Sequence, residues 1–579
     1  MQLNFRPKTK AVLRMVGSVL LALVICALLY YFMLPPLNVY SKSFWWFLFL
    51  VLAVFAVCLG VFNLDRLGSL GSRGKLSRTR RSDGHGGAPA GADASASSFV
   101  RGGRFSRIFV WIIPVPLVVL LLGLLLSSPL FHAKAYAGVV TVEDRDFAAD
   151  MPETTQVTNI ALMDSDSARI LGNRMLGALA DVVSQYVPGA DYTQINYQGK
   201  PMKIANLEYD GFFKWFNNRG HGIPGYIMVD PIANTAEYHE LPEGMRYVGS
   251  GYFGEDLTRA LRFRYPTKIF GRMSFEVNEQ GEVFYIVACS SPRVGMFGAM
   301  DVNEVIIFNP VDGSSQLYPV SETPSWVDIV FDGDLACQKY NWHGTLSGGF
   351  FNSIIGNKGC TQTTADYGYV VLGDDVWYFT GVTSVTSDES NIGFLLTCAR
   401  TGEYRFYPVI GADENSAMGA AEGEVQEKGY QASFPSLVNI AGEPTYIMVL
   451  KDANGLVKLY ALVNVQQYSM VATGETQSAA IAAYTALLAQ NGVGTVPPAS
   501  DGEEAAFTAA DIRYLTLSGV TQVYLTADTG EVYRIEFNAA NEGIVFAKPG
   551  DAFRVTYTTE DSGVRVVSAW EITEAEAGT

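Results

Sequence analysis

The sequence predicts an α+β protein: three N-terminal transmembrane helices, then a mostly antiparallel, β-rich ectodomain and a small C-terminal β-barrel. Three observations support this prediction. Long apolar runs occupy the chain up to Phe131, paired β-prone runs joined by short polar turns recur through its middle, and short alternating strands crowd its end. Apolar runs of about 18 or more residues are typical of membrane spans, and paired runs around an Asn/Asp/Gly turn are typical of hairpins.

The three apolar runs are Val16–Leu34, Phe44–Phe62 and Ile108–Leu126, and none contains a charged residue. Each is long enough to cross the ~30 Å hydrocarbon core of a bilayer as a helix. Basic residues gather before the first run and between the second and third, which places these segments in the cytoplasm. We therefore expect a multi-pass protein of the cell membrane, with a cytoplasmic N-terminus and a large extracytoplasmic domain after Phe131.

The segment Phe131–Ala137 has the A-x-A spacing at which exported chains are cut, so cleavage near Ala135 is one alternative. The two earlier spans and the length of the third run favour an uncleaved anchor. The chain then divides into an N-terminal tail with a two-helix hairpin (1–63), a basic, Gly/Ser/Ala-rich cytoplasmic loop (64–106), a third helix (107–131), two α+β ectodomain modules (138–320 and 321–491), a linker (492–507) and an all-β barrel (508–575).

The charges separate with the predicted location. Residues 1–131 contain 14 Lys/Arg and 3 Asp/Glu, which leaves residues 132–579 with 27 of the 41 Lys/Arg and 55 of the 58 Asp/Glu, a net charge of −28. So acidic a domain is unsuited to nucleic acid, and we expect no nucleic-acid partner. It suits a soluble domain, or one that meets cations or basic partners.

Six predicted hairpins share one pattern, two β-prone runs around a short turn rich in Asn, Asp and Gly. Their irregular spacing excludes a strict propeller or solenoid repeat and indicates two or three antiparallel sheets. The paired runs are Tyr226–Val229 with Ala236–His239, Ser274–Val277 with Glu282–Ala288, Glu304–Phe308 with Ser314–Tyr318, Gly393–Cys398 with Glu403–Tyr407, Tyr446–Leu450 with Leu456–Val463, and Gln522–Thr526 with Glu531–Phe537.

Three helices are predicted between these strands. The first is capped by Ser165 or Asp166 and continues through Val187, before Pro188-Gly189. The others are Phe253–Phe263 and the Ala-rich stretch Thr476–Gln490. From Ile512 to Ile572, five or six short strands indicate a small barrel. An oligonucleotide-binding barrel needs a basic face, and this segment is acidic.

The stretch Pro444–Tyr460, PTYIMVLKDANGLVKLY, followed by a helix, resembles a PepSY-type module. Ile223–His239 resembles one more faintly, and Gly222–Tyr460 as a whole is similar to part of uncharacterised bacterial membrane proteins with an anchored ectodomain. This resemblance implies protein–protein or inhibitory contacts in the cell envelope. It carries no established active site, so no catalytic residue transfers from it.

The stretch Tyr340–Cys360, YNWHGTLSGGFFNSIIGNKGC, is rich in glycine and polar residues outside any clear strand. A hydrolase would use Ser347 as nucleophile, His343 as its base and Asp334 to orient the imidazole. No G-x-S-x-G motif accompanies Ser347. A structural loop and a partner contact remain the alternatives, and the contact residues would be Trp342, His343, Phe350, Phe351 and Asn352.

Cys289, Cys337, Cys360 and Cys398 are an even number of cysteines on the oxidising side of the membrane, so they could form two disulfides in any of three pairings. Free buried thiols are the alternative. The sequence contains no C-x-x-C, H-E-x-x-H, P-loop or EF-hand motif, so we expect no metal and no cofactor.

From these observations we expect a membrane-anchored protein of the bacterial cell envelope, whose ectodomain binds or scaffolds another protein or peptide without catalysis. Self-association is a second form of the same role. One alternative is an envelope hydrolase that uses the Ser347/His343 loop. Another is an accessory or sensor subunit of a membrane complex.

Overall fold

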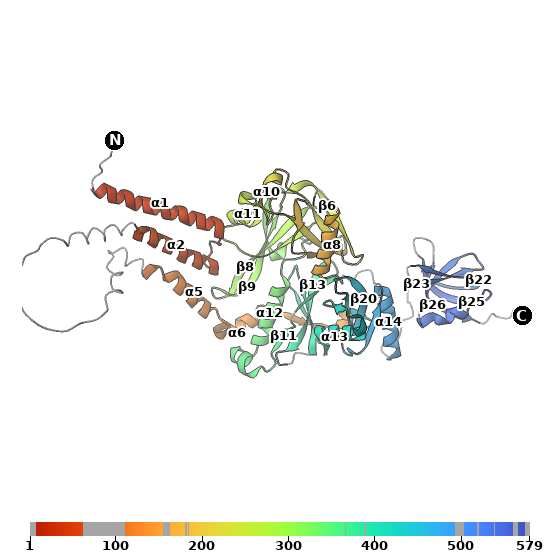
Figure 1. The fold of residues 1–579 in the computed structure, drawn as a ribbon. Helices are drawn as coiled ribbons and strands as arrows, with labels where there is room; N and C mark the ends of the chain where they lie inside the picture. The colour runs from red at the N-terminus through yellow and green to blue at the C-terminus, as the bar shows by residue number, and fades with distance from the viewer. Residues whose placement is uncertain are drawn as a thin grey trace, which may run out of the picture.

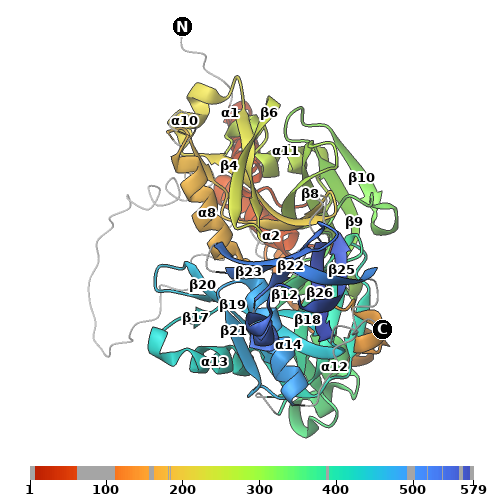
Figure 2. The same ribbon diagram turned by 90° about the vertical axis from the view of Figure 1, so that its right-hand side faces the viewer.

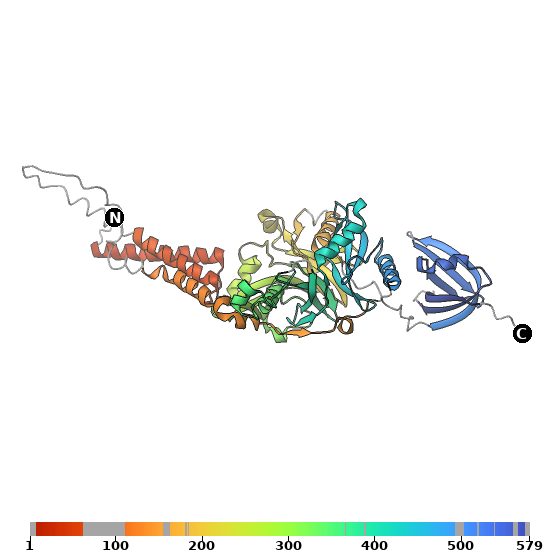
Figure 3. The ribbon, with the colours of Figure 1, turned by 90° about the horizontal axis from the view of Figure 1, so that it is seen from below.

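The computed structural model describes residues 7–61, 111–154, 162–179, 182, 184–364, 366–386, 390–491, 503–517, 520–537, 539–559 and 565–573. Apolar helices, a large body of stacked sheets and a C-terminal barrel follow one another along the long axis of the molecule (Figures 1 and 3). The helices meet one end of the body, and the barrel lies beyond its other end. This is the predicted mixed architecture of helices and mostly antiparallel strands.

Two of the three predicted spans are confirmed as long apolar helices. Helices α1 (Pro7–Met33) and α2 (Lys42–Val61) contain segments long and apolar enough to cross a membrane, Met15–Met33 and Lys42–Leu59. The prediction of one continuous third helix over 107–131 is wrong. Helix α5 (Val115–Leu126) has 12 residues, about 18 Å, and a 54° bend separates it from α6 (Pro129–Ala137). A third span exists only if this bent pair counts as one.

The bend is held by a turn of the body. The Oγ of Ser127 accepts hydrogen bonds from the backbone N–H of Met296 (2.8 Å) and of Phe297 (3.1 Å), and the Tyr136 hydroxyl donates to the Ser127 carbonyl oxygen (2.7 Å). Pro129, at the start of α6, has no N–H to continue the hydrogen bonding of α5. An apolar run alone does not reveal this break, because the contacts lie about 170 residues away.

The first module consists of two antiparallel sheets packed face to face. One sheet is ordered β2-β4-β5-β6 with β3 paired to β4, and the other is β10-β9-β8-β7. Their shared core includes Ile195, Ile227, Phe275 and Phe308, all nearly inaccessible. The elements are α8 (Ser165–Gly177), β2 (Tyr186–Pro188), β3 (Thr193–Tyr197), β4 (Lys200–Tyr209), α10 (Phe212–Asn218), β5 (Ile223–Asp230), β6 (Thr235–Met245), η4 (Phe253–Glu255), α11 (Leu257–Arg264), β7 (Ile269–Val277), β8 (Val283–Val294), β9 (Gly298–Phe308) and β10 (Ser315–Pro319).

The second module stacks a seven-stranded sheet on a five-stranded one. Phe394, Tyr407, Tyr446 and Met448 lie in the core between them, and the outer face of the five-stranded sheet is covered by α14. The elements are β1 (Val142–Asp144), α7 (Phe147–Asp150), α12 (Gly333–Leu346), β11 (Thr361–Thr363), β12 (Gly368–Leu372), β13 (Asp375–Ser384), β14 (Ser390–Cys398), β15 (Tyr404–Tyr407), β16 (Gly411–Ala412), α13 (Glu414–Glu424), β17 (Gln431–Ala432), β18 (Ser436–Ile440), β19 (Glu443–Lys451), β20 (Val457–Asn464), β21 (Val471–Gly474) and α14 (Gln477–Gln490).

The chain that leaves α6 joins the second module before it forms the first. Strand β1 pairs in parallel with β15, with Val142 opposite Tyr404, and Phe147 enters the core of the second module. The division of the sequence at residue 138 had assigned this segment to the first module. The first module is therefore inserted between β1 and α12.

All six predicted hairpins are present with antiparallel register. They are β5–β6, β7–β8, β9–β10, β14–β15, β19–β20 and β23–β24. Their turns use side chains to satisfy the backbone. In the β7–β8 turn the Oδ1 of Asn278 accepts from the N–H of Gln280 and of Glu282, and Gly281 has a φ of +81°.

The first predicted helix differs in its limits. Helix α8 is capped by Asp164, whose carboxylate accepts from the Ser167 N–H, rather than by Ser165 or Asp166. It ends at Gly177 and not at Val187, because Tyr186–Pro188 form strand β2. Helix α14 begins and ends as predicted, with Thr476 as its N-cap.

The C-terminal barrel is confirmed and closes in the order β22-β23-β24-β26-β25. Its strands are β22 (Glu503–Leu517), β23 (Val520–Ala527), β24 (Val532–Glu536), β25 (Ala552–Thr559) and β26 (Arg565–Thr573). The rings of Phe507 and Tyr533 stack 4.3 Å apart in its core. Because β22 starts at Glu503, the barrel includes residues that the sequence analysis had assigned to the linker 492–507.

Removing the Ser127 hydroxyl tests the contact that holds the bend. In Ser127→Ala the N–H groups of Met296 and Phe297 lose their acceptor, and an unsatisfied buried donor costs about 1–3 kcal/mol. We expect a fall of several degrees in the unfolding midpoint of the full-length protein in detergent. Ser128→Ala is the matched control, since the buried Ser128 Oγ has no hydrogen-bond partner among the described residues. Equal midpoints for both variants would contradict the assignment.

Candidate functional site

The three residues of the predicted hydrolase are not brought together. Asp334 lies in the first turn of α12, His343 in its last turn and Ser347 at its C-cap. His343 stands nine positions after Asp334 along the helix, a rise of about 14 Å. The Ser347 hydroxyl donates to the backbone carbonyl of His343, and the Nδ1 of that imidazole lies 2.9 Å from the Ala137 carbonyl oxygen. No strand falls within Tyr340–Cys360, as expected, but its first part, Tyr340–Leu346, belongs to helix α12 rather than to a loop.

Four of the five predicted partner-contact residues are half-buried by contacts within the protein. The Trp342 ring lies edge-on to Tyr136 at 5.2 Å, and Phe350 joins the same apolar cluster. His343 faces Ala137, and the side-chain amide of Asn352 donates to the Lys358 carbonyl. Of the five residues, Phe351 alone is largely exposed, at 69%. Trp342 and Phe350 therefore attach α6 to the body, and Phe351 is left exposed beside them.

The four cysteines after residue 131 form no disulfide: Cys289, Cys337, Cys360 and Cys398 are all free thiols. Burial raises the pKa of Cys289 and of Cys337 to about 12, so both thiols are protonated and unreactive at neutral pH. An even count of cysteines left this alternative open, and the structure does not place them in pairs: Cys289 and Cys398 lie on strands β8 and β14, Cys337 on helix α12 and Cys360 just before β11.

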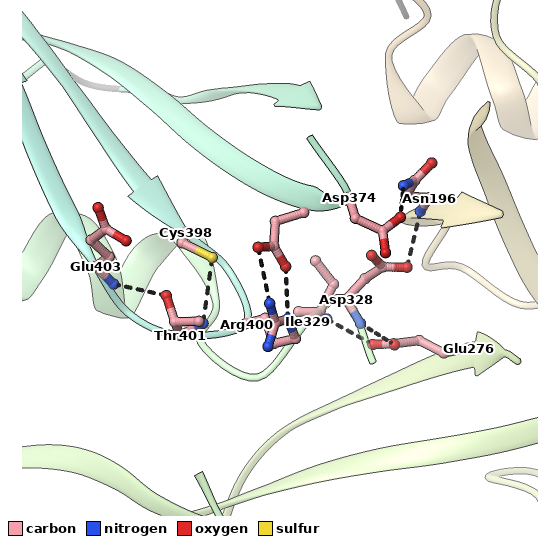
Figure 4. Close-up of polar contacts among 10 residues, drawn as sticks. Asn196, Glu276, Asp328, Ile329, Asp374, Cys398, Arg400, Thr401 and Glu403 are labelled. Atoms are coloured by element: carbon pink, nitrogen blue, oxygen red, sulfur yellow. Dashed lines mark hydrogen bonds and ion pairs between the residues drawn. The ribbon is translucent and has the colours of Figure 1, made fainter. Parts of the chain in front are cut away.

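A buried group of carboxyls lies where the two modules meet (Figure 4). The Glu276 carboxylate on β7 accepts from the backbone N–H of Asp328 (2.8 Å) and of Ile329 (3.1 Å). Asp328 in turn accepts from the N–H of Asn196 on β3 (2.9 Å), and the Asn196 amide donates to Asp374 (2.8 Å) before β13. We call this group the module junction.

At the module junction, ionised carboxylates at both Glu276 and Asp328 would repel each other. Burial raises the pKa of Glu276 to about 7, although three hydrogen bonds to its carboxylate oppose the shift. Burial and the neighbouring Glu276 raise the pKa of Asp328 well above its ordinary range. Each carboxyl is occupied by backbone donors from another element, so the junction joins the two modules.

A second group of acidic residues lines a pocket at the surface of the protein. A pocket of about 430 Å³ lies between α8 of the first module and the second module, and its lining includes Asp164, Asp166, Asp366, Glu414, Met418 and Phe434. Figure 2 shows α8 lying beside β17, β20 and α13 on this side of the molecule. Boundaries between modules are common places for ligand sites. We call this cavity the acidic pocket.

Glu414 is the unusual residue of the acidic pocket. It is the first residue of α13, it is 1% exposed, and its Oε1 accepts the backbone N–H of Gly381. Its Oε2 is buried and makes no close hydrogen bond with the described residues, although the nearby Thr364 side chain favours the ionised form of this carboxyl. Burial raises the pKa of this carboxyl to about 7. A buried carboxylate oxygen without a donor is costly unless something in the pocket supplies one.

The rim of the pocket holds three further acids, of which two are already paired. Asp164 forms an ion pair with Lys451, and Asp166 forms one with Arg169 at 2.9 Å. Although burial opposes ionisation of Asp164, Lys451 and the Ser167 N–H hold its pKa below its ordinary value. Asp366 and Glu414 have no cationic partner among the described residues. The pocket thus has unbalanced negative charge beside the apolar Met418 and Phe434.

Sequence reasoning missed the acidic pocket because its members come from four separate stretches of chain. Asp413-Glu414 reads as an ordinary helix start, and Asp413 does cap α13. No local pattern marks Glu414 as buried. Within the described ranges, no group of three or more His, Cys, Asp or Glu side chains is arranged to hold a metal ion.

Comparisons with known proteins give no family. No family model matches the chain, and no curated protein matches it. Among solved structures, the chain has a faint similarity to the major Malassezia sympodialis allergen Mala s 1, at 9% identity and a TM-score of 0.11, over 53% of this chain and 80% of the allergen. A TM-score that low carries no argument about fold or function.

The raised pKa of Glu414 predicts a pH-dependent gain in stability for Glu414→Gln. The folded state holds this proton more tightly than the unfolded state, so the free energy of unfolding of the wild type falls as pH rises from about 4.5 to about 7. The variant has no carboxyl at position 414, so its free energy of unfolding does not fall for this reason. Its advantage should be absent near pH 4 and reach the order of 3 kcal/mol above pH 7.

Unfolding midpoints of the full-length protein between pH 4 and 8 measure this difference. Glu424→Gln, an exposed acid on the same helix, is the control. An advantage of Glu414→Gln that does not change with pH, or that the control shares, would exclude the assigned cause.

Proposed function

We propose that this is a membrane-anchored binding protein of the cell envelope, whose extracytoplasmic body takes a cationic side chain of a protein or peptide partner into the acidic pocket. The observation that carries this proposal is the buried Oε2 of Glu414, which makes no close hydrogen bond with the described residues, in a pocket whose described lining contains no Lys or Arg. An ammonium or guanidinium group would supply both the missing donor and the missing charge.

The lining of the pocket supports an organic cation. Lysine and arginine carry an apolar stem behind the charge, and Met418 and Phe434 offer apolar surface beside the carboxylates. A volume of about 430 Å³ is large enough for one such side chain. The rim acids Asp166 and Asp366 are exposed and would attract a basic segment before it enters.

The charge of the whole body supports the same kind of partner. The net charge of −28 after residue 131 gives a field that attracts basic segments and repels acidic ones. The hairpin β19–β20 followed by α14 has the hairpin–helix order on which the resemblance to PepSY-type modules rests, and such modules imply protein–protein contacts in the envelope.

The proposal places the N-terminus and residues 64–106 in the cytoplasm and the body outside. The distribution of basic residues supports this orientation. It requires a third crossing. Helix α5 lies against α2 in the structure, which supports counting the bent pair α5–α6 as this crossing.

Binding of a fluorescein-labelled hexalysine peptide to the full-length protein in detergent tests the proposal. At low salt we expect saturable binding that weakens at least about tenfold in Glu414→Gln/Asp366→Asn, because both unpaired charges are removed. Glu424→Gln/Glu427→Gln, two exposed acids outside the pocket, changes the net charge equally and should bind as the wild type does. Equal weakening in the two double variants, or no saturable binding, would contradict the proposal.

A further inference from the structure

The body carries two exposed apolar patches near the ends of its membrane helices. The first is formed by α10 and η4: Phe213 is 77% exposed, Phe216 50% and Phe253 59%. The second is the tip after α12, where Phe351 is 69% exposed, Ile354 60% and Ile355 80%. A protein surface that meets only water rarely groups so many large apolar side chains, so each patch calls for a covering surface.

The first patch is a rigid platform rather than a loose loop. Trp215 is buried beneath it, 2% exposed, and its indole N–H donates to Glu255 (2.8 Å). The Phe212 ring packs on Phe216 and on Tyr252, at 6.2 and 5.1 Å between ring centroids. Phe253 has a φ of +55°, a conformation that non-glycine residues rarely adopt. The body therefore keeps these rings exposed even though the backbone conformation of Phe253 is energetically unfavourable.

The first patch is continuous with the outer end of α1. Arg259 of α11 lies over the Tyr31 ring at 4.3 Å, and the Phe263 ring lies 6.1 Å from Tyr30. Leu37, between α1 and α2, donates its N–H to the Pro266 carbonyl (2.7 Å). Figure 1 shows α11 beside the end of α1, with α10 next to it. These contacts hold the patch at the level where the first two helices leave the membrane.

The second patch is fixed to the third apolar helix. Its π-helical turn, Asn352–Gly356, lies against α12, and α12 packs along α6, which follows directly from α5. On α6 itself, Leu130 and Phe131 are also exposed, at 40% and 56%. The two patches thus belong to the two places where the body joins its helices.

Basic residues accompany both patches although the body is strongly acidic. Exposed Arg219 lies over the Phe216 ring at 4.6 Å, and exposed Lys358 follows the second patch. Aromatic rings with flanking Lys or Arg are typical of surfaces that sit among lipid headgroups, where the rings reach the acyl boundary and the cations meet phosphate.

We propose that the two patches dock the body onto the outer leaflet of the membrane in which α1 and α2 are anchored, with the rings of Phe213 and Phe253 and the side chains of Phe351 and Ile355 inserted into the lipid. The body is then fixed against the bilayer at two separated points and does not swing on its helices. This inference depends on the membrane crossing of α1 and α2 and is independent of the acidic pocket.

Lipid quenching of an environment-sensitive fluorophore tests the docking. The full-length chain is labelled with NBD at Phe213→Cys or Ile355→Cys and reconstituted in phosphatidylcholine vesicles with about 20% phosphatidylglycerol. Phe216→Cys and Ile354→Cys provide a second position in each patch, in case one variant does not fold. Tyr468→Cys is the control: Tyr468 is 56% exposed and lies in the turn between β20 and β21, and Figure 1 shows β20 in the half of the body away from the helices. The labelled wild type gives the background of its six native thiols.

Both patches should be quenched by a lipid carrying a doxyl group near its headgroup, at least about threefold more than the control, and should be protected from aqueous iodide. Labels that iodide quenches as strongly as it quenches the control would overturn the proposal, since the patches would then face water. Labels shielded from both quenchers would also overturn it, because a protein surface and not lipid would then cover them.

Discussion

The carboxylate of Glu276 is the interaction on which the body depends. It accepts two backbone N–H groups of the segment that runs between the modules, at Asp328 and Ile329. Side chains of this segment enter both sides: Val327, Val330 and Phe331 pack against the β7–β10 sheet, while Ile329 packs beside β13. A segment buried on two sides has no water for its N–H groups, so a buried acceptor has to come from a neighbouring strand. Glu276 provides this acceptor, so the same buried segment can pack against both modules.

The hairpins were predictable because their information is local. The Asn and Asp side chains that close a turn stand within four residues of the N–H groups they accept from, as Asn278 shows, and the alternation of side chains continues on either side. The barrel followed from the same signal. These parts of the fold therefore needed no knowledge of distant contacts.

The missed features depend on contacts between distant residues. The break after Leu126 comes from a serine that meets Met296 and Phe297, and an apolar run cannot report it. The sequence suggested Ser347 as a nucleophile and His343 as its base. At the end of helix α12, however, the Ser347 hydroxyl donates to the backbone carbonyl of His343. The acidic pocket was invisible for a related reason: burial of Glu414 is decided by the strands around Gly381, and nothing next to Glu414 in the sequence signals it.

The parallel pairing of β1 with β15 has a consequence for how the chain assembles during synthesis. Val142 is made early, yet its partner Tyr404 is added only after the whole first module has been made. An unpaired strand at a sheet edge can join the wrong partner, and long delays before pairing favour such errors. Here β1 stands a few residues after α6, and α6 packs along α12, which precedes β15 in the chain. This packing keeps β1 close to the sheet that β15 joins, so the delayed partner has a short distance to cover.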